Sequence, residues 1–408
     1  MKHRNTLWRH LAFLILAWPY VTAASGAPGD ITALARDNSS FALDLYRSLA
    51  ATEGNAFFSP YSISTALAMT YAGARGNTEK EMAATLRFSL GQENLHPAFA
   101  ELEKQLTKVQ QGGGVRWMAA NSLWPQDGYP FLPKYLELLK KRYGVSVTAL
   151  DFGRATEEAR RRINGWVEEK TQGKIKDLIQ PGVLDPLTRL VLVNAIYFKG
   201  KWASQFKAAD TKEAPFHVSA DKTVQAPMMF QKLKCRHAGF PSLNILEIPY
   251  TGGDVSLLVL LPSEVDGLRG LERELTVENL NRWRDKLVER DVLVYLPRFK
   301  MTSAFRLDDT LSSMGMPDAF STRADFAGMD GSNWLYIGAV IHKAFVEVNE
   351  EGTEAAAATA VVMLLKAMPP GRPMIFNADH PFVFLILEKQ TGSILFMGRL
   401  ADPAQAGE

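Results

Sequence analysis

The residues with the clearest chemical potential lie between Glu350 and Lys366. An acidic cluster at 350–354 precedes eleven uncharged residues, 355–365, and the run ends at Lys366. Serine proteases with a carboxylate in the specificity pocket cut after such a basic residue. This stretch therefore suits cleavage by a protease better than it suits a reaction carried out by the chain itself.

Other chemical signatures are scarce. The chain has no Gly-x-x-x-x-Gly-Lys-Ser/Thr loop, no His-Glu-x-x-His and no Gly-x-Ser-x-Gly. Its 7 histidines are scattered, and its single cysteine, Cys235, excludes an internal disulfide and a zinc site built on several thiolates. We therefore expect no catalytic residue, no metal site and no cofactor. A Ser-His-Asp triad that forms only in space stays open.

Length and composition indicate one large globular protein. The chain has 408 residues, of which 47% are hydrophobic and 22% charged. Residues 1–23 have the basic start, apolar run and small residues of a signal peptide, so we expect secretion to an extracellular or periplasmic space. The apolar run is shorter than the roughly 20 residues of a membrane span, which makes a retained anchor the weaker alternative.

Charge and surface motifs say little about partners. Residues 1–23 carry three basic residues and no acidic one, so their removal changes the net charge from +2 to about −1. We expect neither nucleic acid nor a membrane as partner, and we interpret the basic runs 140–142 and 160–162 as solvated faces. Asn38 begins an Asn-Ser-Ser glycosylation motif, which is meaningful only in a host that glycosylates.

Hydrophobic periodicity predicts a helical first half and a strand-rich second half. The helical pattern covers residues 40–49, 62–71, 79–86, 97–109, 133–143 and 155–172. Thr78 and Glu81 form a possible capping box, and Pro97 and Pro133 suit first helical turns. Strands are predicted from 191, at 256–261, 292–296 and 336–348, and as a hairpin of 382–387 with 394–400. No composition break marks a linker.

Seven motifs resemble those of the serpin family, inhibitory type, in the order in which that family has them. They are Asn-Ala-Phe-Phe-Ser-Pro-Tyr-Ser-Ile at 55–63, Ala-Asn-Ser-Leu-Trp at 120–124, Ile-Asn-Gly-Trp-Val at 163–167, Thr-Gln-Gly-Lys-Ile at 171–175, Leu-Val-Asn-Ala-Ile-Tyr-Phe-Lys-Gly-Lys-Trp at 192–202, Ala-Phe-Val-Glu-Val-Asn-Glu-Glu-Gly-Thr at 344–353 and Ala-Asp-His-Pro-Phe at 378–382.

The resemblance implies a mixed α/β (α+β) fold with three β-sheets, about nine helices and an exposed reactive-centre loop at about 350–375. Residues 24–408 would form this single domain. In that family a protease cuts the loop and is held as a covalent acyl-enzyme while the loop inserts into the central sheet. The resemblance thus implies a monomeric suicide-substrate inhibitor whose partner is a serine protease.

The residues themselves fit an inserting strand. Alternate positions from Thr353 to Met363 carry no charge and begin small, while Glu354 falls on the opposite face. Propensity alone would instead place an alanine-rich helix here. We expect the hinge and inserting strand to comprise Glu350, Gly352, Thr353, Ala355, Ala356, Ala357 and Ala358.

The resemblance also implies where the loop is cut. Inhibitory members have the scissile bond sixteen residues after the position of Glu350, which makes it Lys366–Ala367 and favours trypsin-like proteases. Arg372 is a poor rival because proline follows it. A shifted register would expose Leu364 or Leu365 to chymotrypsin-like or subtilisin-like enzymes. A cysteine protease also stays open.

Further positions carry over from the family. Ser59, Ser62, Asn194 and His342 match a polar cluster that controls opening of the central sheet, although a merely structural buried network would look the same. Trp202 matches the tryptophan at the loop's entry point, or else is an ordinary core aromatic.

Two other kinds of serpin fit less well. A non-inhibitory binding serpin would be expected to carry charged, proline or bulky residues on the entering face at 353–359, and this chain has none. A heparin-type cofactor is unsupported, since the predicted helix at 97–109 balances two lysines against two glutamates.

Overall fold

The computed structural model describes residues 28–145, 147–353 and 374–405. The expected signal peptide, the alanines at 355–358 and the predicted bond Lys366–Ala367 lie outside the described residues. Among the residues that are described, no helix is both long and apolar enough to cross a membrane.

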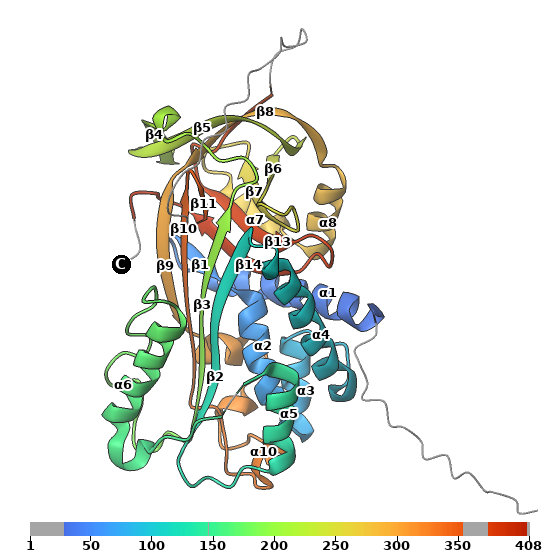
Figure 1. The fold of residues 1–408 in the computed structure, drawn as a ribbon, viewed down its shortest axis with the longest axis vertical. Coiled ribbons are helices and arrows are strands. Elements are labelled where there is room, and N and C mark those ends of the chain that lie inside the picture. The colour runs from blue at the N-terminus through green and yellow to red at the C-terminus, as the bar shows by residue number, and fades with distance from the viewer. Residues whose placement is uncertain (1–27, 146, 354–373, 406–408) are drawn as a thin grey trace, which may run out of the picture.

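A five-stranded sheet runs through the centre of the molecule (Figure 1). Its strand order is β2 (Val115–Pro125), β3 (Leu190–Lys201), β11 (Gly352–Thr353), β10 (Ala339–Asn349) and β9 (Phe299–Arg306). β2, β9 and β11 are antiparallel to their neighbours, whereas β3 and β10 are parallel to each other.

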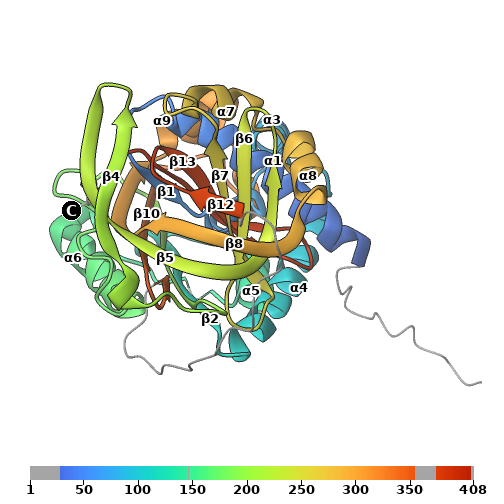
Figure 2. The same ribbon diagram turned by 90° about the horizontal axis from the view of Figure 1, so that it is seen from above.

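A nine-stranded sheet forms the other β-layer. Its order is β1 (Ala56–Phe58), β14 (Ile394–Leu400), β13 (Phe382–Glu388), β7 (Val255–Pro262), β6 (Leu243–Pro249), β5 (Lys222–Gly239), β8 (Val288–Pro297) and β12 (Met374–Asn377), with β4 (Lys212–Ser219) paired to β5. Figure 2 shows β5 and β8 side by side across the top of the molecule. Because β5 is long enough to pair with β4, β6 and β8, two of the three expected sheets are joined by continuous hydrogen bonding.

Ten α-helices lie in the described part of the chain, close to the expected nine. They are α1 (Pro28–Leu49), α2 (Pro60–Tyr71), α3 (Gly76–Thr85), α4 (Gln92–Gln111), α5 (Pro133–Tyr143), α6 (Phe152–Lys170), α7 (Leu268–Glu274), α8 (Val277–Asp285), α9 (Asp308–Met314) and α10 (Ala327–Asp330), with short 3₁₀ turns η1 (Ala208–Asp210) and η2 (Asp318–Phe320). The mixed α/β fold is confirmed.

Two hydrophobic clusters hold these layers together. The smaller one lies between α6 and one face of the central sheet, where Ile163 packs with the odd-numbered residues of β3 from Val191 to Tyr197. The larger one fills the space between the other face, the nine-stranded sheet and the helices α1, α2 and α4. Both faces of β3 are thus buried, which explains why its sequence is a nearly continuous apolar run.

Two predicted helix starts are wrong because tertiary contacts use the same residues. α3 begins at Gly76, and its expected capping box instead serves other segments: Thr78 Oγ1 accepts from the Asp325 N–H at 2.9 Å and Glu81 from the Asp318 N–H at 3.0 Å. α4 begins at Gln92, so Pro97 lies inside the helix rather than at its start. Only α5 begins at its predicted proline, Pro133.

The glycosylation motif at Asn38, left open by the sequence, is buried in the folded protein. Asn38 lies within α1, is 1% exposed and accepts a hydrogen bond from Ser64 Oγ at 2.7 Å. A glycan requires a surface asparagine, so Asn38 is no acceptor in the folded protein.

Candidate functional site

The candidate site is the seam between the parallel strands β3 and β10. Residues 339–345 of β10 lie opposite residues 191–197 of β3. Beyond this stretch the two strands separate, and β11 lies between them, antiparallel to both: Thr353 is opposite Gly200 and Val348, and Gly352 is opposite Lys201 and Asn349. The seam is therefore occupied by a third strand at one end and closed along the rest.

Gly352 permits the turn from β10 into β11. A Cβ atom there would lie 1.9 Å from the Gly200 carbonyl oxygen, so no side chain fits without moving the backbone of β3. Asn349 Oδ1 supports the turn by accepting from the N–H groups of Glu351 and Gly352 at 3.1 and 3.2 Å. The close approach of β3 thus requires glycine at position 352.

Thr353 points into the protein core. It is 0% exposed, and its hydroxyl lies 2.7 Å from the hydroxyl of Tyr250. Burial raises the pKa of Tyr250 well above its ordinary value, so the phenol stays protonated. The face that the sequence assigns to the core is therefore the face that Thr353 uses.

Trp202 lies at the entry of the seam. Its ring stacks on Tyr250 with centroids 4.7 Å apart and planes 11° apart, and its Nε1–H donates to the Asn349 carbonyl at 2.9 Å. The backbone N–H of Trp202 donates to the Glu351 carbonyl at 3.0 Å. Sequence reasoning missed Tyr250, which follows β6 and carries no local signal of its role.

Glu350 anchors the chain just before β11. Its carboxylate accepts from Thr211 Oγ1 at 2.7 Å and lies 3.5 Å from Arg298 Nη1, and its carbonyl accepts from the Phe206 N–H at 2.8 Å. These contacts tie the end of β10 to neighbouring segments, so that motion after Gly352 need not displace β10.

The four predicted polar residues meet below the seam. His342 Nδ1 is hydrogen-bonded to Asn194 Oδ1, its neighbour in the parallel register, and His342 Nε2 accepts from the Ser59 N–H at 3.2 Å. Asn194 Nδ2 donates to Ser62 Oγ at 2.6 Å. Ser59 also caps α2, since its hydroxyl accepts from the Ser62 N–H at 3.2 Å.

A fifth member, Asn121, was missed as a site residue. Its Oδ1 accepts from Asn194 Nδ2 at 2.5 Å and from Ser62 Oγ at 3.0 Å. Asn121 lies directly opposite Asn194 in the β2–β3 register. The only signal in the sequence was its place in the motif at 120–124.

The polar cluster is uncharged. His342 is 0% exposed, and burial lowers its pKa to about 3, so the imidazole is neutral near neutral pH. Because Nε2 accepts a hydrogen bond, the ring proton is on Nδ1 and points to Asn194. The hydrogen bond between His342 and Asn194 therefore joins β3 to β10, and these buried groups cannot exchange it for a bond to bulk water.

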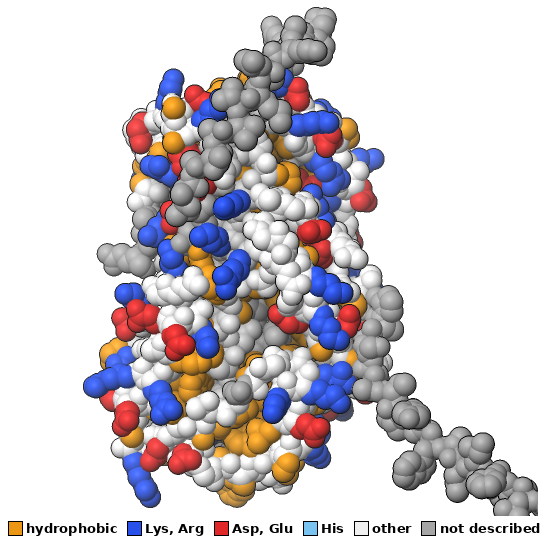
Figure 3. Space-filling model, viewed as in Figure 1, with side chains coloured by type: hydrophobic (Ala, Val, Ile, Leu, Met, Phe, Trp, Pro, Cys, Tyr) orange, Lys and Arg blue, Asp and Glu red, His pale blue; other side chains and the backbone are white. Residues whose placement is uncertain are grey.

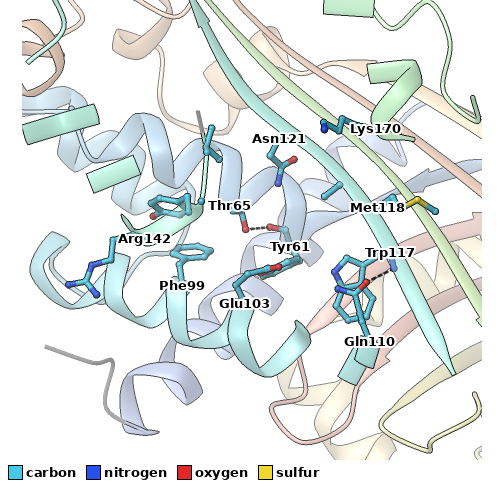
Figure 4. A pocket seen from close by; sticks show the side chains of 14 residues that line it. Tyr61, Thr65, Phe99, Glu103, Gln110, Trp117, Met118, Asn121, Arg142 and Lys170 are labelled. Carbon is cyan, nitrogen blue, oxygen red and sulfur yellow. Dashed lines mark hydrogen bonds between the residues drawn. The ribbon is translucent and has the colours of Figure 1, made fainter. Parts of the chain in front are cut away.

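A cavity of about 430 Å³ borders β2 on the side of the polar cluster (Figure 4). It lies among α2, α4, α5 and β2, with Asn121 and Trp117 on the strand and Phe99 and Tyr61 on the helices. The Tyr61 hydroxyl donates to Glu103 at 2.6 Å at its edge. Side chains of β2 such as Trp117 and Asn121 therefore border open space here instead of packing fully against the helices.

Comparison with known proteins gives one family. The family model described as serpin (serine protease inhibitor) matches residues 36–403. The leukocyte elastase inhibitor of Sus scrofa is 44% identical over 380 residues, and that of Homo sapiens 41% over 381, each covering 91% of this chain and 99% of the relative.

Solved structures agree with this family. Uncleaved ovalbumin matches with a TM-score of 0.82 at 34% identity, over 91% of this chain and 100% of the other. Human thyroxine-binding globulin in complex with thyroxine matches with a TM-score of 0.83 at 32% identity, over 92% of this chain and 99% of the other.

The prediction of secretion is wrong by these comparisons. The leukocyte elastase inhibitors that the chain resembles are cytoplasmic serpins that lack signal peptides. The prediction used only the composition of residues 1–23, a few basic residues before a short apolar run.

Family model, relatives and fold coincide over nearly the whole length of the chain. The chain therefore belongs to the serpin family and is a protease inhibitor rather than an enzyme.

Proposed function

We propose that the chain inhibits trypsin-like serine proteases, with Lys366–Ala367 as the reactive bond and insertion of the cut loop between β3 and β10 as the trapping step. The observation that carries this proposal is β11, since Gly352 and Thr353 already lie between the two strands. Insertion then means extending an existing strand rather than starting a new one.

The register of β11 predicts where the inserted residues would lie. Thr353 is opposite Gly200 and Val348, and each further residue moves one position down both strands. Six positions on, residue 359 meets Asn194 on β3 and His342 on β10. Asn194 and His342 are themselves opposite each other, so the register of β11 with β3 agrees with its register with β10. This agreement supports insertion of one continuous strand along the whole seam.

Residue 359 is threonine and shares the buried face with Thr353. Separating β3 from β10 breaks the hydrogen bond between Asn194 and His342. The Thr359 hydroxyl can both donate and accept, so it can take up the bonds that both partners lose. A polar residue among alanines and valines thus has a place in the proposed inserted state.

Insertion also has a driving force. It replaces the parallel β3–β10 pairing with two antiparallel pairings, which are slightly more stable per residue. Burying Val361 and Met363 adds about 1.5–3 kcal/mol each. The attached protease need only be distorted modestly, because loss of one oxyanion-hole donor slows deacylation by roughly a hundred- to a thousandfold.

The lysine at 366 supports a trypsin-like target, since a carboxylate at the base of the specificity pocket binds it. A second candidate is favoured by the relatives, which are named for inhibition of elastase. In that case Leu364 or Leu365 would precede the cut, and a chymotrypsin-like, subtilisin-like or cysteine protease would be the target. A binding role like that of thyroxine-binding globulin is less supported, because the entering face is uncharged and small.

The test mixes the protein with trypsin and, separately, with elastase. We expect a complex with trypsin that survives boiling in detergent, and a released carboxyl-terminal fragment that begins at Ala367 by mass spectrometry. Lys366→Leu should abolish the complex with trypsin and leave the fold unchanged. A complex with elastase alone, or a fragment beginning at Leu365 or Lys366, would establish the second candidate; cleavage without any complex would show a substrate.

A further inference from the structure

A hollow of about 600 Å³ lies beside the segment that links α10 to β10. Figure 1 shows α10 at the lower end of the molecule, and Figure 3, in the same view, shows hydrophobic side chains at this end. Two aromatic and four polar side chains line the hollow: Trp334, Tyr336, Ser321, Thr322, Ser332 and Asn333. We call it the Trp334 hollow.

Trp334 presents its indole ring to solvent. It is 84% exposed, whereas Trp117, Trp124, Trp202 and Trp283 are at most 7% exposed. Large aromatic rings left in water are enriched where proteins bind ligands or partners, because one side of the ring is available for stacking. Packing within the chain therefore does not account for this side chain.

Asp330 fixes the turn that carries Trp334. Its carboxylate accepts from the Tyr129 hydroxyl at 2.7 Å, and from the hydroxyl and the backbone N–H of Ser332 at 2.6 and 2.7 Å. The turn is thus braced before any ligand arrives, so that binding has to order little of the protein.

The polar groups of the hollow retain hydrogen-bonding capacity. Among the described residues, the side chains of Thr322, Asn333 and Tyr336 form no hydrogen bond within the protein. A hydroxyl, a carboxamide and a phenol can each both donate and accept. Thr322 and Asn333 are exposed and Tyr336 is half-buried, so these groups are available to a ligand in the hollow.

The Trp334 hollow has no charge of its own. None of the described residues that line it is acidic or basic. An adjoining cavity of about 410 Å³ shares Tyr336 with it, and there Arg306 lies 2.7 Å from the carboxylate of Asp308. A charged ligand would therefore find no unpaired counter-charge in the Trp334 hollow, which favours a neutral one.

We propose that the Trp334 hollow binds a neutral oligosaccharide. A sugar ring has a face of C–H groups that can stack on the indole, and hydroxyl groups that can bond to Thr322, Asn333 and Tyr336. Sites for small ligands measure about 300–1,000 Å³ and combine aromatic walls with a few polar groups, as this hollow does. The adjoining cavity gives room for further sugar units.

This sugar site is separate from the seam. Trp334 and Tyr336 precede β10, whereas β11 pairs with the other end of β10 at Val348 and Asn349. The 11 residues of β10 span about 36 Å at roughly 3.3 Å per residue. The proposal therefore does not depend on the protease target or on the position of the reactive bond.

The test titrates the full-length protein with maltotriose, cellotriose and N-acetylchitotriose at millimolar concentrations, followed by saturation-transfer NMR and intrinsic fluorescence. We expect binding of at least one sugar, with an affinity that changes less than about twofold between low and high salt because the ligand is neutral. Trp334→Ala should bind at least about tenfold more weakly, since the stacking ring is lost. Thr322→Val keeps the shape of the side chain but removes its hydroxyl, and should bind about two- to tenfold more weakly.

The matched control is Ile375→Ala, which removes another exposed apolar side chain, 59% exposed on β12, and should leave the affinity unchanged. Circular dichroism and a thermal melt establish that the variants fold; should Trp334→Ala not fold, Thr322→Val still tests the hollow. Absence of binding by all three sugars would overturn the proposal, and so would equal losses in Trp334→Ala and Ile375→Ala. Tighter binding of choline or of a proline-rich peptide would overturn it in favour of an aromatic cation site or a peptide groove.

Discussion

Replacing Thr353 by arginine should turn the inhibitor into a substrate. The wild-type side chain is 0% exposed and its hydroxyl lies 2.7 Å from that of Tyr250. Arginine loses this hydrogen bond, worth about 1 kcal/mol, and would have to leave an unpaired guanidinium beside the stacked rings of Tyr250 and Trp202. Burying an unpaired charge costs several kcal/mol in real proteins.

Because Thr353 is already buried in the uncut structure, arginine should first displace β11, and insertion would then have to bury the guanidinium. A penalty of about 3 kcal/mol on that step would slow insertion roughly 150-fold. Deacylation would then overtake insertion, and the protease would be released with the inhibitor cut. The position of the cut should stay unchanged, because Thr353 is far along the chain from Lys366. The assay is the ratio of detergent-resistant complex to cleaved inhibitor on a denaturing gel after reaction with trypsin.

The matched control is Glu354→Arg, which places the same side chain one residue on and hence on the opposite face of the inserting strand. It should retain most of the complex. Thr353→Ser keeps the hydroxyl and should also inhibit. The reasoning is refuted if Thr353→Arg still traps trypsin as the wild type does, or if Glu354→Arg loses trapping to the same extent.

Three further predictions concern the seam and its polar cluster. Gly352→Ala should displace β11 and reduce complex formation, because its Cβ would lie 1.9 Å from the Gly200 carbonyl oxygen. The control Gly165→Ala on α6, where a Cβ would have no atom within 4 Å, should be neutral or raise the free energy of unfolding by up to about 1 kcal/mol. The yield of complex and urea denaturation are measured for both variants. Asn121→Ala removes the acceptor of two half-buried hydrogen bonds and should lower the free energy of unfolding by about 1–3 kcal/mol, with an unchanged urea midpoint as the contrary result. His342 has a folded pKa of about 3, below its unfolded value near 6.5, so the unfolded state binds more protons between these pH values. The free energy of unfolding should therefore fall as the pH drops below about 6.5, by about 2 kcal/mol at pH 5. Urea titrations at both pH values should show a smaller loss for His342→Asn.

Local sequence patterns correctly predicted the elements whose ends are set by residues nearby in the sequence. α5 begins at Pro133, and β13 and β14 form the expected hairpin. The starts of α3 and α4 were wrong, since the capping residues Thr78 and Glu81 bind segments more than 230 positions away. Such partners are not visible within a window of a few residues.

The sequence by itself determined the family, through motifs spread over the chain, and the uncharged alternating face that begins at Thr353. It also named Ser59, Ser62, Asn194 and His342, which the fold brings together. Only the tertiary structure decided that Tyr250 receives Thr353 and that Asn121 completes the polar cluster. The physical reason is register: spacing along a strand sets which face a residue occupies, but pairing between distant strands sets what it faces.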